Sequence, residues 1–229
     1  MALRKWVRLP SNWIRRQGLR ELQWDRDGRG SDNIAALMTL TAIAHHASAD
    51  RGVAKLTYDA LCSMTGLSRA KLSNGLDVPE RIKVVERTPE GRSSYKLSNF
   101  SLNGGWAMLP AECMYSSGKI AAFSDLHLRN ETELNALKLF FIFVAQRGRD
   151  TNMANIGYDK IEEYTAIDRS KIKAAISRLA VIPLVYVEQV PSKKNPLGFA
   201  NAYRIVGLNP YKHMGTMGRG MNAFDYDEA

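Results

Sequence analysis

The stretch TYDALCSMTGLSRAKL, residues 57–72, decides the fold, and it occurs a second time as GYDKIEEYTAIDRSKI, residues 157–172. The two copies are 100 residues apart, and no gap is needed to align the chain with itself from residue 6 to residue 85. Of these 80 positions 17 are identical, whereas roughly one in twenty would match by chance, so the repeat is genuine. A unit of about 100 residues used twice predicts two similar domains.

Each copy predicts the same order of elements. A long helical pattern comes first, followed by a short extended segment, a helix beginning at Tyr58 or Tyr158, and a tight turn. A third helix then begins after Ser68 or Asp168, which are suitable N-caps, as Thr57 is for the helix before it. Ser31 and Asp32 are expected to cap the first long helix. Its counterpart, which includes residues 136–144, is apolar on almost all sides, so it is expected to lie between domains or at a dimer contact.

A β-hairpin is expected to close each unit. The first is predicted from Ile82–Arg87 and Ser94–Leu97, and the second from Leu184–Val190 and Ala202–Val206. The offset grows from 100 to 108 here, so the second hairpin is eight residues longer. Pro79 and Pro183 are expected to end the third helix of each unit, since proline lacks the backbone N–H that a helix needs.

The composition favours a globular protein with a polyanionic partner. The chain has 229 residues, 45% hydrophobic and 24% charged, and a formal net charge of +9. Both repeats are basic when the acidic C-terminus is set aside, which favours nucleic acid. No membrane span or signal peptide is predicted. Two cysteines, expected to be buried thiols, are too few for a disulfide framework, so a cytoplasmic protein is expected.

Helix, short strand, helix, tight turn, helix and hairpin is the order of a winged helix-turn-helix domain, which residues 31–97 and 131–206 resemble. The resemblance implies a mainly α chain with small β-hairpins (α+β) and two tandem winged helix-turn-helix domains. Residues 1–104 would form the first domain with an N-terminal arm, residues 105–208 the second with a longer wing, and residues 209–229 a C-terminal tail.

Winged helices read the major groove of DNA with the third helix and contact phosphates or the adjacent minor groove with the wing. The candidate DNA-binding residues of the first unit are therefore Ser68, Arg69, Lys71, Ser73, Asn74, Arg92 and Lys96. Those of the second unit are Arg169, Ser170, Lys171, Lys173, Arg178, Lys193 and Lys194. Arg69/Arg169 and Lys71/Lys171 are the basic pairs repeated on this helix. Solvated surface charge is the alternative interpretation of them.

No enzyme, cofactor or metal is predicted. Tyr58 and Tyr158 could suggest a DNA-nicking tyrosine, but the His-apolar-His metal pair of that chemistry does not occur in the sequence. The glycines near residue 218 lack the lysine of a phosphate-binding loop, and the histidines and cysteines lack zinc spacing.

Two winged helices in one chain resemble plasmid and mobile-element replication initiators. That resemblance implies binding of double-stranded DNA at repeated origin sites, a monomer–homodimer balance, host replication proteins as partners, and association with a plasmid or nucleoid. A transcription regulator, such as a repressor of a mobile element or phage, is the alternative. A third reading, winged helices that bind proteins, is disfavoured by the basic third helices. Neighbouring direct repeats would favour the initiator, and a single palindrome the regulator.

Overall fold

The helix caps predicted at Thr57, Ser68 and Asp168 are present. In the computed structural model, which describes residues 3–25, 29–87, 93–149, 151–191 and 198–208, the Ser68 hydroxyl accepts a hydrogen bond from the Lys71 N–H at 3.2 Å. The Asp168 carboxylate accepts one from the Ser170 N–H at 2.8 Å, and the Thr57 hydroxyl one from Ala60 at 3.1 Å. Each bond satisfies an N–H that has no partner within its helix.

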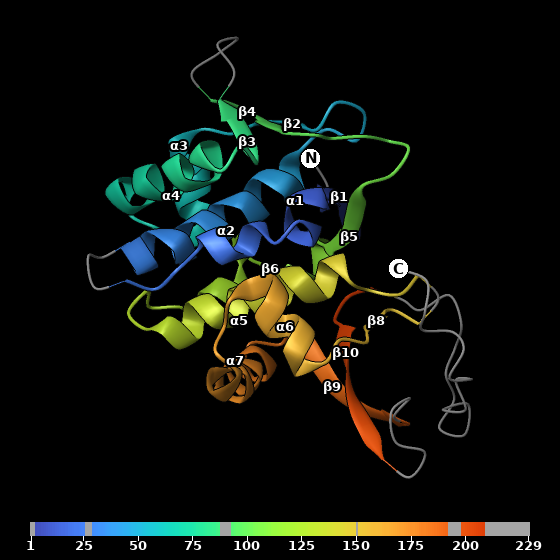
Figure 1. Cartoon of the computed structure of the whole chain (residues 1–229). Helices are drawn as coiled ribbons and strands as arrows, with labels where there is room; N and C mark the ends of the chain where they lie inside the picture. Colours follow the sequence, from blue (N-terminus) through green and yellow to red (C-terminus); the bar gives the residue numbers. More distant parts are fainter. Residues whose placement is uncertain (1–2, 26–28, 88–92, 150, 192–197, 209–229) are drawn as a thin grey trace.

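The elements follow one another in a similar order in the two repeats (Figure 1). The first repeat contains β1 (Trp6–Pro10), α1 (Asn12–Arg15), η1 (Gly18–Glu21), α2 (Arg29–His46), β2 (Val53–Lys55), α3 (Tyr58–Thr65), α4 (Arg69–Arg81), β3 (Val85–Arg87) and β4 (Ser94–Leu97). The second contains β5 (Trp106–Pro110), η2 (Glu112–Met114), β6 (Tyr115–Ser116), β7 (Lys119–Ile120), η3 (Ala121–Phe123), α5 (Glu131–Ala145), β8 (Met153–Ala154), α6 (Tyr158–Thr165), α7 (Arg169–Val181), β9 (Val185–Pro191) and β10 (Phe199–Ile205).

Small antiparallel sheets accompany these helices, which confirms the predicted α+β class. The three-stranded sheets have the orders β2-β4-β3 and β8-β10-β9, so the closing strand is central in each. The second hairpin pairs over seven residues, from Val185↔Ile205 to Pro191↔Phe199, whereas β3 and β4 pair over three. The predicted longer second hairpin is therefore present.

A pseudo-twofold axis relates the two repeats. Strands β1 and β5 pair antiparallel, with Trp6 opposite Pro110, Arg8 opposite Met108, and Pro10 opposite Trp106. Because equivalent residues differ by 100, Arg8 lies opposite its own equivalent, and the axis passes between the two. The equivalent helices α2 and α5 also pack against each other, in agreement with such an axis. The repeats are thus arranged like the two halves of a dimer.

A segment of each repeat also packs against the other repeat across this axis. In the first repeat, η1 packs on α6 of the second, and in the second repeat, β7 packs on α3 of the first. Arg20 donates a hydrogen bond to the Glu163 carbonyl at 2.7 Å, while the Tyr115 hydroxyl is 3.2 Å from the Nδ1 of the buried His45. One continuous apolar core runs through both repeats, and α5 lies between α2 and α7. Helix α5, which was expected to lie between domains or at a dimer contact, is thus covered by a helix of each repeat.

Some predicted details were wrong. Helix α4 continues through Pro79 to Arg81, since this proline is in the last turn and only one helical hydrogen bond is lost. Helix α2 already begins at Arg29, so Ser31 and Asp32 lie inside it and do not cap it. Both cysteines are free, but Cys62 is only partly buried and Cys113 is exposed. Within the described part of the chain, no helix is both long and apolar enough to span a bilayer.

Candidate nucleic-acid interface

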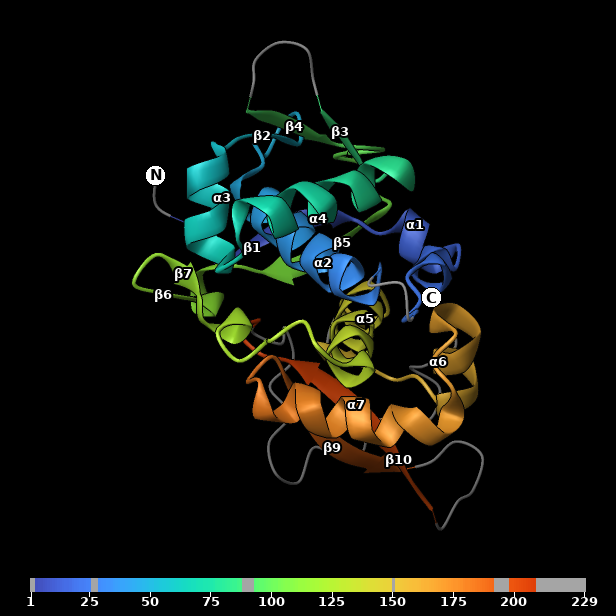
Figure 2. The same ribbon diagram turned by 90° about the vertical axis from the view of Figure 1, so that its left-hand side faces the viewer.

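Helices α4 and α7 cross the same face of the molecule. Figure 2 looks onto this face, with α4 above and α7 below the ends of α2 and α5. Helix α4 begins next to α3 on one side of this face, and α7 begins next to α6 on the other side (Figure 2). The two helices therefore run in opposite directions. This face therefore presents together the two helices, one in each repeat, that were predicted to contact DNA.

The turn before each of these helices has the same geometry. Gly66 and Ala166 both adopt left-handed backbone, with φ of 75° and 53°. The hydroxyls of Thr65 and Thr165 each donate a hydrogen bond to the carbonyl four residues earlier and accept one from the backbone N–H of the apolar residue that follows the left-handed position. The turn therefore sets the direction of α4 and of α7 in the same way.

In the first repeat, the predicted side chains at the start of α4 lie close together. Arg69 forms an exposed ion pair with Asp59 of α3. Lys71 turns toward α2, where its ammonium lies 2.7 Å from Asp32. The Asn74 amide is exposed and 3.3 Å from the same carboxylate. Ser68 caps the helix, and Ser73 is partly exposed.

In the second repeat, the predicted residues form a similar group on α7. Arg169 pairs with Asp159 and lies 5.8 Å from the Tyr158 ring centre. Lys171 pairs with Glu131 of α5 at 2.7 Å, and Ser170 is hydrogen bonded to Asp168. Arg178 is set back from this group: it is half-buried, donates to the Asp125 carbonyl, and lies 3.7 Å from the buried Glu133.

Lys173 is the cation of α7 that is most available to a ligand. It is exposed, and its ammonium forms no ion pair with any residue that the structure describes. Arg69, Arg169 and Lys171 belong to exposed ion pairs, which are worth only about 0–1 kcal/mol each. Phosphate groups can therefore compete for Arg69, Arg169 and Lys171.

The repeated ion pair explains part of the sequence repeat. Asp59–Arg69 and Asp159–Arg169 occupy equivalent positions and join the two helices on either side of the turn. From the sequence, these arginines were expected to be either DNA contacts or solvated surface charge. The repetition of the aspartates together with the arginines was the signal that could have revealed the pair.

Helices α4 and α7 differ in charge. Helix α7 contains no acidic residue from Arg169 to Val181, whereas α4 contains Asp77 and Glu80, both paired with Arg87. The hydrogen bond that Lys171 donates to Glu131 raises the pKa of the Lys171 ammonium. The hydrogen bonds from Ser170 lower the pKa of Asp168. The surface of α7 is thus the more favourable of the two for a polyanion.

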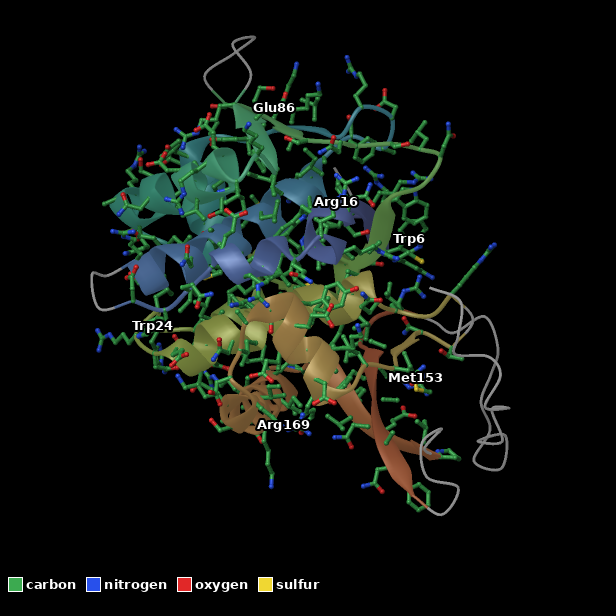
Figure 3. The ribbon with its side chains drawn as sticks, viewed as in Figure 1. Trp6, Arg16, Trp24, Glu86, Met153 and Arg169 are labelled. Carbon is green, nitrogen blue, oxygen red and sulfur yellow. The ribbon has the colours of Figure 1, made fainter. Side chains whose placement is uncertain are left out.

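The predicted wing residues are only partly within the described structure. Lys96 on β4 is exposed and 3.8 Å from Glu86 on β3. Glu86 lies at the opposite end of the molecule from Arg169 of α7 (Figure 3). Arg92, Lys193 and Lys194 lie outside the described residues. The hairpin β9–β10 extends away from the core (Figure 1), and its outer part exposes Phe199, Gln189 and Asn201.

Among the residues that the structure describes, no group of three or more His, Cys, Asp or Glu side chains could hold a metal ion. In comparisons with protein-family models, with curated proteins and with solved structures, no match to this chain was found.

Proposed function

We propose that this chain binds double-stranded DNA through α4 and α7, as two tandem winged helix-turn-helix domains, and that it initiates replication of a plasmid or mobile element. The observation that carries the proposal is the joint presentation of these two helices, with their basic residues, on one face (Figure 2). A major groove is wide enough to admit such a helix.

Three further observations support the proposal. Each helix follows a helix across a tight turn and precedes an antiparallel hairpin, the order of a winged helix. Basic residues lie at the N-terminal ends of α4 and α7, where Arg69 and Arg169 are well exposed. The formal net charge of +9 adds long-range attraction for a polyanion.

Replication initiation, rather than DNA binding alone, rests on the resemblance of the paired units to plasmid initiators. In that role the bound sites would be repeats at an origin, and host replication proteins would be further partners. If the preferred DNA turns out to be a single promoter site, the protein is a transcription regulator instead.

Selection from random duplexes, followed by footprinting, tests DNA binding. We expect enrichment of a defined sequence with two protected major-groove segments on one side of the DNA. Replacing Arg169 and Lys173 by Ala should weaken binding to the selected duplex at least tenfold. Arg51→Ala is a matched control, because Arg51 is also an exposed, ion-paired arginine (with Asp50) but does not lie on α4 or α7. Failure to enrich any sequence would refute the proposal.

A further inference from the structure

We infer that a single copy of this chain recognises an imperfect inverted repeat, with two half-sites about one helical turn apart, each read by a different set of side chains. This inference rests on the proposed function and specifies the DNA that one chain binds: at an origin, each of the repeated sites would itself be such an inverted repeat.

The symmetry of the chain gives the orientation of the half-sites. The β1–β5 register places Arg8 opposite its own equivalent, Met108, so a twofold axis relates the repeats. Helices α4 and α7 are equivalent under this axis and run in opposite directions (Figure 2). Two DNA-reading helices that are related by a twofold axis fit DNA whose two half-sites are related by a twofold axis as well, which is an inverted repeat. A direct repeat, whose half-sites have the same orientation, would instead require that α4 and α7 be related by a translation.

Helix packing gives the spacing. Helices α4, α2, α5 and α7 pack against one another in that order. Three packing steps of about 8–10 Å amount to roughly 24–30 Å between the axes of α4 and α7, which is nearer to the full-turn spacing of major grooves than to a half-turn. Successive major grooves on one side of B-DNA are about 34 Å, or 10–10.5 base pairs, apart. A half-turn spacing of about 17 Å would place the grooves on opposite sides of the duplex, which does not suit two helices on one face.

The side chains explain why the repeat should be imperfect. Arg69/Arg169 and Lys71/Lys171 are the same in both helices, but the outward residues between and after them differ. Helix α4 presents Ala70, Ser73 and Asn74, where α7 presents Ser170, Lys173 and Ala174. Asn favours adenine and Lys favours guanine. The two half-sites should therefore share some bases and differ at others.

Reciprocal exchange of these side chains tests the inference. One variant carries Ser170→Ala, Lys173→Ser and Ala174→Asn, so that α7 presents the residues of α4. The other carries Ala70→Ser, Ser73→Lys and Asn74→Ala. All six positions are at least partly exposed, and folding can be checked by circular dichroism. We expect each variant to select a more symmetric inverted repeat than the wild type, one of the α4 half-site and the other of the α7 half-site.

Binding to designed duplexes completes the test. Reversing one half-site to give a direct repeat, or inserting five base pairs between the half-sites, should weaken binding at least tenfold. Native mass spectrometry should find one chain per duplex. Selection of half-sites in the same orientation, or two chains on each inverted repeat, would overturn this inference while leaving DNA binding intact. If no duplex is selected at all, the proposed function fails, and this inference fails with it.

Discussion

Trp6 and Trp106, equivalent residues of the two repeats, stack on each other with ring centres 5.9 Å apart and an interplanar angle of 14°. The Arg8 guanidinium lies 5.0 Å from the centre of the Trp106 ring and 6.0 Å from that of Trp6. The stack lies beside β5, on the side of the molecule away from α4 and α7 (Figures 1 and 3). It therefore joins the repeats behind the proposed interface.

A double-mutant cycle should detect this stack. Trp6→Leu and Trp106→Leu should each destabilise the chain, and the double variant should lose less free energy of unfolding than the sum of the two. The expected coupling is about 0.5–1.5 kcal/mol, the usual range for an aromatic pair. Denaturant unfolding of the four proteins measures it. Additive losses would mean that the rings contribute through burial alone.

The turns before α4 and α7 provide a second prediction, since the two repeats carry different residues, Gly66 and Ala166, at the same left-handed position. Ala166→Gly should stabilise the chain, because left-handed backbone costs a residue with a Cβ roughly 1–2 kcal/mol, part of which is offset by the greater flexibility of unfolded glycine. A gain of about 0.5–1 kcal/mol is expected in the free energy of unfolding.

Gly66→Ala is the matched reverse change. An added Cβ at Gly66 would meet no atom within 4 Å, so only the backbone conformation opposes it. A loss of about 0.5–1 kcal/mol is expected. If both substitutions shift the midpoint of unfolding in the same direction, the left-handed conformation does not control stability at these two positions.

These positions also show what the sequence could predict and what it could not. The caps at Ser68 and Asp168 were predictable, because a cap depends on residues within one turn of the chain. The β1–β5 pairing was not, because nothing local in the sequence around Trp6 or Trp106 indicates that these two segments pair with each other. The pairing of Arg69 with Asp59 depends on the angle of the turn between their helices, and the only sign of it in the sequence is the repetition of both residues as Asp159 and Arg169.

A buried lysine provides a pH-dependent prediction. Lys138 on α5 is 1% exposed, and its ammonium donates a hydrogen bond to the Leu22 carbonyl of the other repeat at 2.9 Å. Burial lowers its pKa from 10.5 to about 8. Between these two values the unfolded chain binds more protons than the folded chain, so this residue makes stability rise with pH.

Replacing Lys138 by Met should remove that rise. The wild type should gain stability relative to Lys138→Met between pH 7.5 and pH 9.5, by on the order of 2 kcal/mol. Urea unfolding at four pH values measures the difference. Lys119→Met is the control, since Lys119 is exposed on β7, and its difference from the wild type should stay nearly constant. A constant difference for Lys138→Met as well would show that this ammonium is not desolvated.

The ion pairs on the proposed DNA-binding face lead to the last prediction. Asp59 and Asp159 engage Arg69 and Arg169, and they also place negative charge where DNA phosphates would approach. Asp159→Asn should therefore tighten DNA binding several-fold at low salt, because it frees Arg169 and removes a repulsive charge. If the freed arginine takes up one more phosphate contact, the slope of log K against log salt should steepen by about 0.9. Fluorescence anisotropy between 50 and 200 mM salt measures both quantities. Asp50→Asn, which breaks an exposed ion pair with Arg51 that involves neither α4 nor α7, is the control. Equal effects of Asp159→Asn and Asp50→Asn would indicate general charge attraction and no contact by Arg169 itself.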